Sequence, residues 1–412
     1  MLIALAAGSL SCSTIDSKVT VLRVTNWGGA GDDSQYYKTL REIYETFEQR
    51  NPGIKIQVEG IPGSQDYVSK VLLSHVAKSA PDVITLDASS AAVFIENGIL
   101  RDLAPLAQND PDFSFDNYFP NVVQIASRGE KIYAVPMDFT PMVLYYNKAL
   151  FDAAGVEYPN ADWDYEDFLL AAKKLTNGDH YGLAFANWMP AWILWLWNNG
   201  GEVVAEENGE WKSVFASRRN EETVSWIYDL IMVHKIAPSL SATAAQGINF
   251  FQDGKAAMEI SGHWAMDGYR NAKNLKIDQI GVAPIPTNLE SGVTVMYEAG
   301  LAIGKNCKHP DAAWKFIQYM SSAEVQRKYH QSGIAVSARL DISKERATDE
   351  RERAFLQIVK SARPPWGSKV VGYDLVEEVG QKMMDAVLKN GVPPKTALAQ
   401  AEKRINEELN RK

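Results

Sequence analysis

The fold is decided by residues 133–148, which read YAVPMDFTPMVLYYNK. This stretch predicts a β-strand, a short proline-bounded break, a second strand, and a helix that Asn147-Lys148 opens. A buried strand that pauses and resumes suits a crossing between two lobes. Strands and helices alternate in one pattern before this stretch and in another pattern after it. We therefore expect two lobes joined by strand-like crossings. Such a chain can close on something held between its lobes.

The length and composition agree with a globular protein of more than one domain. The chain has 412 residues, of which 46% are hydrophobic and 23% are charged. This length suits two or three domains. The net charge is -9 and no run of Lys or Arg stands out, which argues against binding nucleic acid or anionic lipid through a basic surface. The 11 Trp fit either core packing or stacking of indoles on apolar ring faces.

The first residues resemble the tail of a bacterial lipoprotein signal. A short apolar run, too short to span a bilayer, ends in small residues and Cys12. We therefore expect residues 1–18 to be a signal and linker segment, with Cys12 lipidated. No Lys or Arg precedes the run and Ser9 stands where an apolar residue is usual, so an ordinary secretory signal is the alternative. Cys307 is the one other cysteine, which leaves no disulfide framework.

Strands and helices alternate along the rest of the chain. In the first part, strands are expected at 19–26, 54–58 and 81–87. Helices are expected at 67–79 and over the stretch from Tyr37 to Phe47, where apolar residues recur at helical spacing. This interval predicts a mostly parallel, doubly wound sheet. Later helices are expected at 164–175, 191–198, 224–233, 312–320 and 396–409, and later strands at 181–185 and 256–260. A second crossing is expected at 280–286.

Several short motifs occur in one order and spacing: Ala80–Ile84, Asn97–Leu103, Tyr146–Gly155, Asp253–Met258, Gly262–Trp264, Gly300–Ile303 and Ala312–Ile317. Through them, nearly all of the mature chain resembles the extracellular solute-binding proteins of family 1. These are the sugar-binding lipoprotein subunits of ABC importers, and they are similar to maltose-binding protein. The resemblance implies an α/β, two-lobe, periplasmic-binding-protein-like fold with mixed, mostly parallel sheets and a hinge. It implies an N-terminal lobe of 19–139 with 283–309 and a C-terminal lobe of 140–282 with 310–412, with a third crossing near 307–310.

The resemblance also implies a function. We expect an extracytoplasmic, non-enzymatic, monomeric receptor that binds a sugar or oligosaccharide between its lobes and delivers it to membrane permease subunits, with no cofactor. Membrane contact would come only through the lipid anchor. A receptor for a polyamine, which needs carboxylates interleaved with aromatic rings, or for an anion, which needs helix N-termini or Arg at the cleft, stays open. A secreted glycoside hydrolase is the alternative from another class.

Candidate ligand-binding residues are aromatic or planar polar groups near strand ends and crossings. A sugar offers weakly apolar ring faces and a rim of hydroxyls, which such groups complement. Loops at the carboxyl ends of strands supply them in open α/β sheets. The candidates are Trp27, Gln65, Asp66, Asp87, Asp138, Trp188, Trp192, Trp264, Tyr297, Glu298, Arg363 and Trp366.

Each candidate has a plainer reading as well. Asp87 could cap the following helix. Trp188 and Trp192 flank Pro190, and we expect one of them in the cleft and the other in the core. The six His show no metal-ligand spacing, so no metal site is expected.

Overall fold

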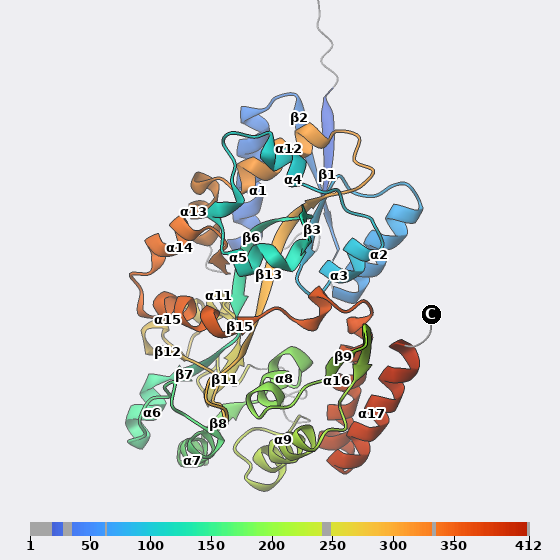
Figure 1. Cartoon of the computed structure of the whole chain (residues 1–412). Coiled ribbons are helices and arrows are strands. Elements are labelled where there is room, and N and C mark those ends of the chain that lie inside the picture. Colours follow the sequence, from blue (N-terminus) through green and yellow to red (C-terminus); the bar gives the residue numbers. More distant parts are fainter. Residues whose placement is uncertain (1–18, 28–34, 62–63, 241–248, 332–334, 410–412) are drawn as a thin grey trace, which may run out of the picture.

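The chain forms two lobes, one above the other in Figure 1. The computed structural model describes residues 19–27, 35–61, 64–240, 249–331 and 335–409. Each lobe is built around its own sheet, and the two sheets are connected by extended chain. The two-lobe α/β fold expected from the sequence is therefore confirmed.

The first lobe surrounds a sheet in the order β14-β6-β13-β3-β1-β2, with β15 paired to β13. Its strands are β1 (Thr20–Asn26), β2 (Ile54–Gly60), β3 (Val83–Asp87), β6 (Val135–Pro141), β13 (Thr294–Ile303), β14 (Val336–Ser337) and β15 (Ala362–Arg363). Its helices are α1 (Gln35–Arg50), α2 (Ser64–Val76), α3 (Ala91–Glu96), α4 (Ala104–Gln108), α5 (Pro120–Val123), α12 (Pro310–Met320), α13 (Ala323–Gln331) and α14 (Leu340–Arg346). A small ribbon pairs β4 (Ser127–Arg128) with β5 (Lys131–Ile132).

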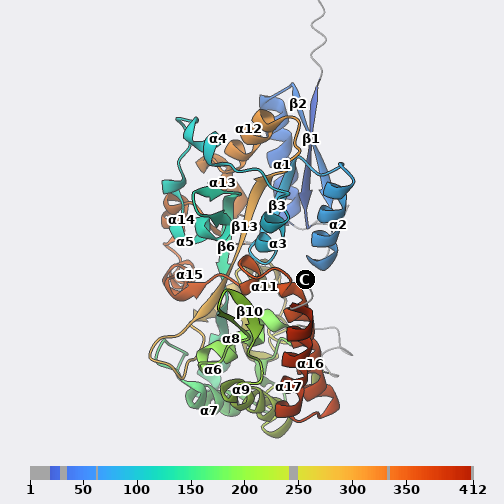
Figure 2. The ribbon, with the colours of Figure 1, turned by 45° about the vertical axis from the view of Figure 1, so that its right-hand side comes forward.

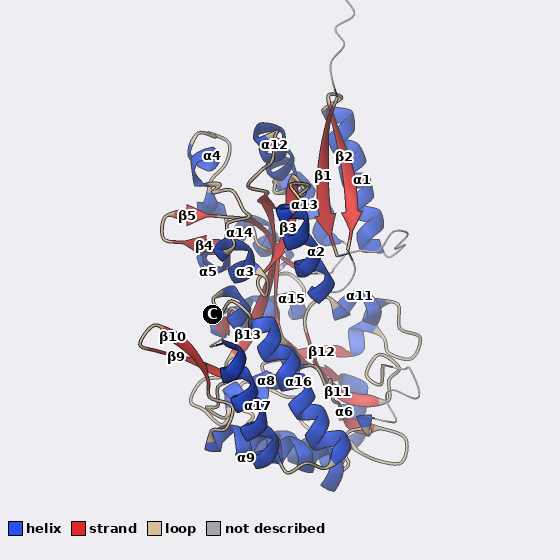
Figure 3. Cartoon of the chain, turned by 90° about the vertical axis from the view of Figure 1, so that its right-hand side faces the viewer, coloured by secondary structure: helices blue, strands red, loops and turns tan. Residues whose placement is uncertain are grey.

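The second lobe holds a sheet in the order β12-β7-β11-β8. Its strands are β7 (Val143–Asn147), β8 (Tyr181–Ala184), β11 (Ala256–Ser261) and β12 (Ile280–Ala283), and a separate hairpin joins β9 (Val204–Glu207) to β10 (Glu210–Ser213). The accompanying helices are α6 (Lys148–Ala154), α7 (Tyr165–Leu175), α8 (Met189–Asn198), α9 (Arg218–Tyr228), α16 (Tyr373–Asn390) and α17 (Pro394–Leu409). Figure 3 shows α16 and α17 side by side in this lobe. Nearer the first lobe lie α11 (Ala265–Arg270) and α15 (Glu350–Ile358).

Two long strands carry the chain between the lobes. β6 ends at Pro141 in the first sheet, and β7 begins at Val143 in the second. β13 runs antiparallel to β6 from Met296 to Leu301 and then continues beside β3. Figure 2 shows both strands extending between the first lobe and the junction of the lobes, in opposite directions. Because β13 runs against both β3 and β6, the first sheet is mixed. Its parallel pairs with β1 are those of β2 and β3.

The position of the later crossings differs from the expected one. The segment 280–283 is β12 and pairs with β7 inside the second sheet, so the second crossing is β13. No crossing lies near 307–310, because α12 packs on the first lobe: Phe316 contacts Tyr44 and Phe47 of α1, with ring centroids 5.6 and 5.2 Å apart. The segment from α12 to α14 therefore belongs with the first lobe, which corrects the expected assignment of all of 310–412 to the second.

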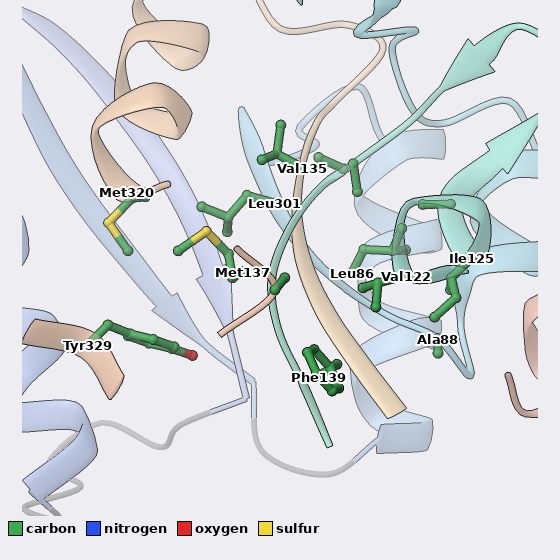
Figure 4. Packing of buried hydrophobic residues seen from close by; sticks show 14 of the residues in the cluster. Leu86, Ala88, Val122, Ile125, Val135, Met137, Phe139, Leu301, Met320 and Tyr329 are labelled. Carbon is green, nitrogen blue, oxygen red and sulfur yellow. The ribbon is translucent and has the colours of Figure 1, made fainter. Parts of the chain in front are cut away.

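Hydrophobic side chains fill both sides of the first sheet. In Figure 4, Met137 and Met320 lie on one side of the β6 and β13 ribbons, and Val122 and Ile125 lie on the other. This packing fixes the two crossing strands rigidly in the first lobe. Among the described residues, no helix combines the length and apolar character needed to cross a membrane.

Candidate functional site

A cavity of about 440 Å³ opens between the lobes, beside the crossing strands. Sites for small molecules commonly measure about 300–1,000 Å³. The first lobe contributes the lining residues Trp27, Tyr36, Tyr37, Asp87, Ser89, Asp138, Tyr329 and Ala335. Crossing strands contribute Thr140, Tyr297, Glu298 and Ala299, and the second lobe contributes Trp188, Pro190, Trp264 and Glu377.

Three aromatic rings form one wall of the cavity. Trp188 lies nearly parallel to Tyr297, at 24° with centroids 6.3 Å apart, and the Trp264 ring lies 6.2 Å from Trp188 and 6.1 Å from Tyr297. Trp188 precedes Pro190 at the start of α8 and is 47% exposed. So large an exposed indole beside two other rings offers a flat apolar face to a ligand.

Gly262 determines where the Trp264 ring can lie. A Cβ at position 262 would stand 2.3 Å from Cζ3 of Trp264, which is closer than any real contact. Tyr145 donates a hydrogen bond to the Gly262 carbonyl at 2.9 Å and holds this turn in place. The absence of a side chain at 262 therefore lets the indole fold back beside β11 and face the cavity.

On the opposite side the first lobe offers further rings. Trp27 directly follows β1 and packs on Tyr67, with ring centroids 5.8 Å apart. Tyr36 and Tyr37 come from the first turn of α1, and their rings meet edge to face at 4.8 Å. Aromatic side chains therefore face the cavity from both lobes.

Two carboxyl groups stand in one row across the first sheet. Ala299 of β13 pairs with Asp87 of β3 on one side and with Asp138 of β6 on the other. Asp138 is buried and accepts a hydrogen bond from the Tyr329 hydroxyl at 2.7 Å, and the Tyr36 hydroxyl lies 2.9 Å from that of Tyr329. Burial raises the pKa of Asp138 to about 7 and also raises the pKa of Asp87.

Glu298 is the most unusual group in the cavity wall. The residue is 3% exposed, and within the described part of the chain neither carboxyl oxygen has a hydrogen-bond partner. Burial, followed by the nearby Asp138 and Asp87, raises its pKa well above the ordinary value. Glu298 pairs with Phe139 of β6, whereas Ala299 pairs with Asp87 and Asp138. Because side chains alternate along a strand, the Glu298 carboxyl points to the sheet face opposite those two groups.

A fourth carboxyl comes from the second lobe. Glu377 lies on α16 and lines the cavity, and burial raises its pKa to about 8. Beyond it, a second hollow of about 720 Å³ continues along α16 past Asp66 and Lys382. Asp87, Trp188, Pro190 and Glu377 border both spaces, so the inner cavity opens into the outer hollow.

The structure brings seven of the predicted residues together in the inner cavity: Trp27, Asp87, Asp138, Trp188, Trp264, Tyr297 and Glu298. Asp66 borders the outer hollow. The side chain of Gln65 and the whole of Cys12 lie outside the described residues. Asp87 also accepts a hydrogen bond from the Ser90 backbone at 2.6 Å, so it both supports the turn before α3 and lines the cavity.

Three predicted residues lie elsewhere. Trp192 is fully buried in the core of the second lobe, because it lies one turn into α8 with its ring turned inward. Arg363 pairs with Glu202 at 2.6 Å, and the Trp366 indole donates to the same carboxylate at 2.8 Å. None of the three lines the inner cavity, so their expected place in the cleft is corrected.

Several lining residues were missed: Tyr36, Tyr37, Ser89, Thr140, Pro190, Ala299, Tyr329, Ala335 and Glu377. Tyr36 and Tyr37 follow the first strand closely, so their sequence position could have indicated them. Tyr329 and Glu377 come from α13 and α16, late in the chain, and nothing local in the sequence distinguishes them from helix residues that face the core or solvent.

The lining combines ring faces with acidic groups. Among the described residues that line the inner cavity, none is Lys, Arg or His. No group of three or more His, Cys, Asp or Glu side chains is arranged to hold a metal ion in the described part of the chain. The site can therefore stack flat faces and accept hydrogen bonds or positive charge.

Comparisons with known proteins agree with this architecture. A family model described as bacterial extracellular solute-binding protein matches residues 30–327. A putative binding protein of Brucella abortus is 23% identical over 378 residues, 88% of this chain and 87% of that one. An arabinooligosaccharide-binding protein of Halalkalibacterium halodurans is 22% identical over 280 residues, 66% of this chain and 61% of that one. Among solved structures, an ABC substrate-binding protein of Listeria monocytogenes in complex with cycloalternan is 26% identical, with a TM-score of 0.83 over 96% of this chain and 100% of that one.

Proposed function

The chain belongs to the bacterial extracellular solute-binding protein family, as its sequence motifs indicated, and we propose that it is the substrate-binding subunit of an ABC importer, with a saccharide as its ligand. The observation that carries the proposal is the aromatic wall of the inner cavity. Trp188, Trp264 and Tyr297 present ring faces between the lobes, beside carboxyl groups that can accept hydrogen bonds from hydroxyls.

Similar proteins support a saccharide as the ligand. One relative is described as binding arabinooligosaccharides, and the Listeria structure holds cycloalternan. The inner cavity together with the outer hollow along α16 gives room for a ligand longer than one ring.

Transport follows from the same proposal. The two lobes would close on the saccharide by bending at β6–β7 and β13, and the closed monomer would deliver it to the permease subunits. Cys12 would carry a lipid that keeps the protein at the outer face of the membrane. The family is one of binding proteins, so the saccharide would be released unchanged.

A saccharide panel tests the proposal. The protein is screened by thermal shift, because a ligand that binds only the native state raises the melting temperature, and positive cases are titrated by calorimetry. We expect at least one saccharide to bind and to be recovered intact. Trp188→Ala should weaken this binding by roughly 1–3 kcal/mol without lowering the melting temperature of the free protein, since Trp188 is largely exposed.

Two results would contradict the proposal. If no saccharide in a broad panel binds while spermidine does, the protein is a receptor for another solute. If products of hydrolysis appear during incubation, it is an enzyme. Trp211→Ala, which removes a partly buried indole that packs on Trp366 outside the inner cavity, is the matched control and should leave the affinity for the saccharide unchanged.

A further inference from the structure

We infer that Glu352 of α15 is a positioning residue for the cavity between the lobes: through His263 it sets where the Trp264 ring lies in the aromatic wall. Glu352 does not line the inner cavity, so it would act on a ligand only through its neighbours. The inference rests on the proposed function, in which the aromatic wall contacts the saccharide.

The turn that carries Trp264 is anchored at the residue before it. His263 is 1% exposed, and its Nε2 lies 3.1 Å from a carboxyl oxygen of Glu352. Because an ionised carboxyl only accepts hydrogen bonds, the His263 ring donates here. The other ring nitrogen, Nδ1, is buried and has no partner among the described residues. The bond to Glu352 therefore fixes the orientation of the imidazole.

The charge of Glu352 strengthens this anchor. Burial acts to raise its pKa, but the hydrogen bond from His263 and the charge of Arg346 outweigh that effect and hold the pKa below its ordinary value. Nη2 of Arg346 lies 3.4 Å from the carboxyl oxygen that His263 also contacts, and Nη1 donates to the His330 carbonyl in the first lobe. Hydrogen bonds to an ionised carboxyl are stronger than those between neutral groups. The carboxylate thus holds the His263 ring more tightly than a neutral acceptor would.

α15 contacts the imidazole at a second place. Phe355, which follows Glu352 by three residues on this helix, packs on the His263 ring with centroids 4.7 Å apart. The helix therefore holds the ring both by its Nε2 edge and by its face.

The peptide that joins Gly262 to His263 is held on both sides. Its carbonyl accepts from the Tyr145 hydroxyl at 2.9 Å, and its N–H donates to the Thr140 hydroxyl at 2.6 Å. With this peptide fixed, the two backbone dihedral angles of His263 decide where Trp264 stands. The anchored imidazole restricts those angles, so the anchor determines the place of the indole in the aromatic wall.

The first experiment follows the Trp264 ring without any ligand. The protein is labelled with fluorotryptophan, and the fluorine NMR resonance of Trp264 is identified as the one missing from the Trp264→Phe variant. We expect Glu352→Ala to shift or broaden this resonance, because His263 loses its anchor. Glu352→Gln, whose amide oxygen can still accept from the imidazole, should restore most of the original signal.

Two further variants make this readout specific. Glu350→Ala is the matched control, since Glu350 lies on the same helix but pairs on the surface with Lys148 at 3.3 Å, and it should leave the Trp264 resonance unchanged. His263→Leu removes the imidazole and leaves Glu352 beside Arg346. It should move the resonance as Glu352→Ala does, and it serves as the test if Glu352→Ala does not fold.

The second experiment measures the consequence for binding. Glu352→Ala should weaken the affinity for the best saccharide of the panel roughly 3- to 10-fold, the scale of one lost hydrogen bond. In a Trp264→Ala background the same change should cost no further affinity, because both substitutions act at one ring. In a Trp27→Ala background, on the opposite wall of the cavity, the two losses should add.

The two readouts separate this inference from the proposed function. A Trp264 resonance that Glu352→Ala leaves unchanged, or an equal loss of affinity with and without Trp264, overturns the inference and leaves the saccharide receptor standing. A resonance that moves as expected in a protein that binds no saccharide supports the anchor and contradicts the proposed function instead.

Discussion

Two clusters of acidic and aromatic side chains in this protein look alike in composition and differ in how their hydrogen bonds are satisfied. In one, Glu202 accepts hydrogen bonds from the indoles of Trp197 and Trp366, at 2.9 and 2.8 Å, and pairs with Arg363 at 2.6 Å. In the other, Glu298 lies beside the aromatic wall of the cavity with neither oxygen paired within the described residues.

The difference separates a structural role from a binding role. The Glu202 cluster satisfies its own carboxylate, and the Arg363 guanidinium also covers the Trp197 ring at 3.4 Å from its centroid. It therefore fastens the segment after β15 to the second lobe. The cavity beside Glu298 instead keeps the Trp188 ring 47% exposed, so a ligand can cover it. Residue types alone do not tell the two apart, since Trp366 and Glu298 were both predicted to bind ligand.

Of the changes that test this comparison, Glu202→Ala should have the largest effect, a loss of stability. Two indole N–H groups and one guanidinium lose a shared acceptor, so we expect the free energy of unfolding to fall by roughly 2–3 kcal/mol. The affinity for ligand should not change, because Glu202 does not line the inner cavity. Urea denaturation measures the first quantity and calorimetry the second. Glu206→Ala, at an exposed position in the nearby strand β9, should leave both quantities unaltered. An unchanged stability in Glu202→Ala would disprove the fastening role.

A smaller effect, on binding only, is expected from Gly262→Ala. The added Cβ would overlap the Trp264 ring, so the indole must swing out of the cavity wall, and the affinity for ligand should fall by about 1–2 kcal/mol. Gly53→Ala is the control, since a Cβ there would meet nothing within 4 Å. Normal affinity in the Gly262→Ala variant would mean that Trp264 does not contact the ligand.

The smallest effect concerns pH. The pKa values of Asp138 and Glu377 are raised on folding to about 7 and about 8, and that of Glu298 is raised well above the ordinary value. The folded state therefore binds more protons than the unfolded state in this range, so the melting temperature of the free protein should fall as pH rises from about 5 to about 8. Glu298→Gln should flatten this slope and Glu206→Gln should not. Equal slopes in the two variants would show that Glu298 already ionises freely in the folded protein.

Features encoded by neighbouring residues were predictable from the sequence. Asn147 was expected to open a helix, and its side chain accepts from the backbone of Ala149 and Leu150 at the start of α6. Asp164 was expected to cap the next helix, and it forms a capping box with Asp167. The two strands expected within residues 133–148 are also present, as β6 ending at Pro141 and β7 beginning at Val143, because proline and strand patterns act over a few residues.

Features that depend on distant partners were not predictable. The lobe to which α12 belongs is set by the packing of Phe316 on Phe47, more than 250 residues earlier in the chain. The place of Trp366 is set by Glu202 in the same way. Tyr329 reaches the cavity because α13 packs beside α1. A hydrophobic pattern shows that a helix has a buried face, but it does not say what covers that face.

The most direct test of the comparison replaces one tryptophan in each cluster. Trp264→Ala should lower the affinity for the best saccharide of the panel by roughly 1–3 kcal/mol and leave the melting temperature nearly unchanged. Trp366→Ala should lower the melting temperature and leave the affinity of the folded protein unchanged. Calorimetric titration and thermal melts of both variants decide the matter. If Trp366→Ala loses affinity while Trp264→Ala binds normally and melts early, the ligand lies at the Glu202 cluster and the assignment of the cavity between the lobes is wrong.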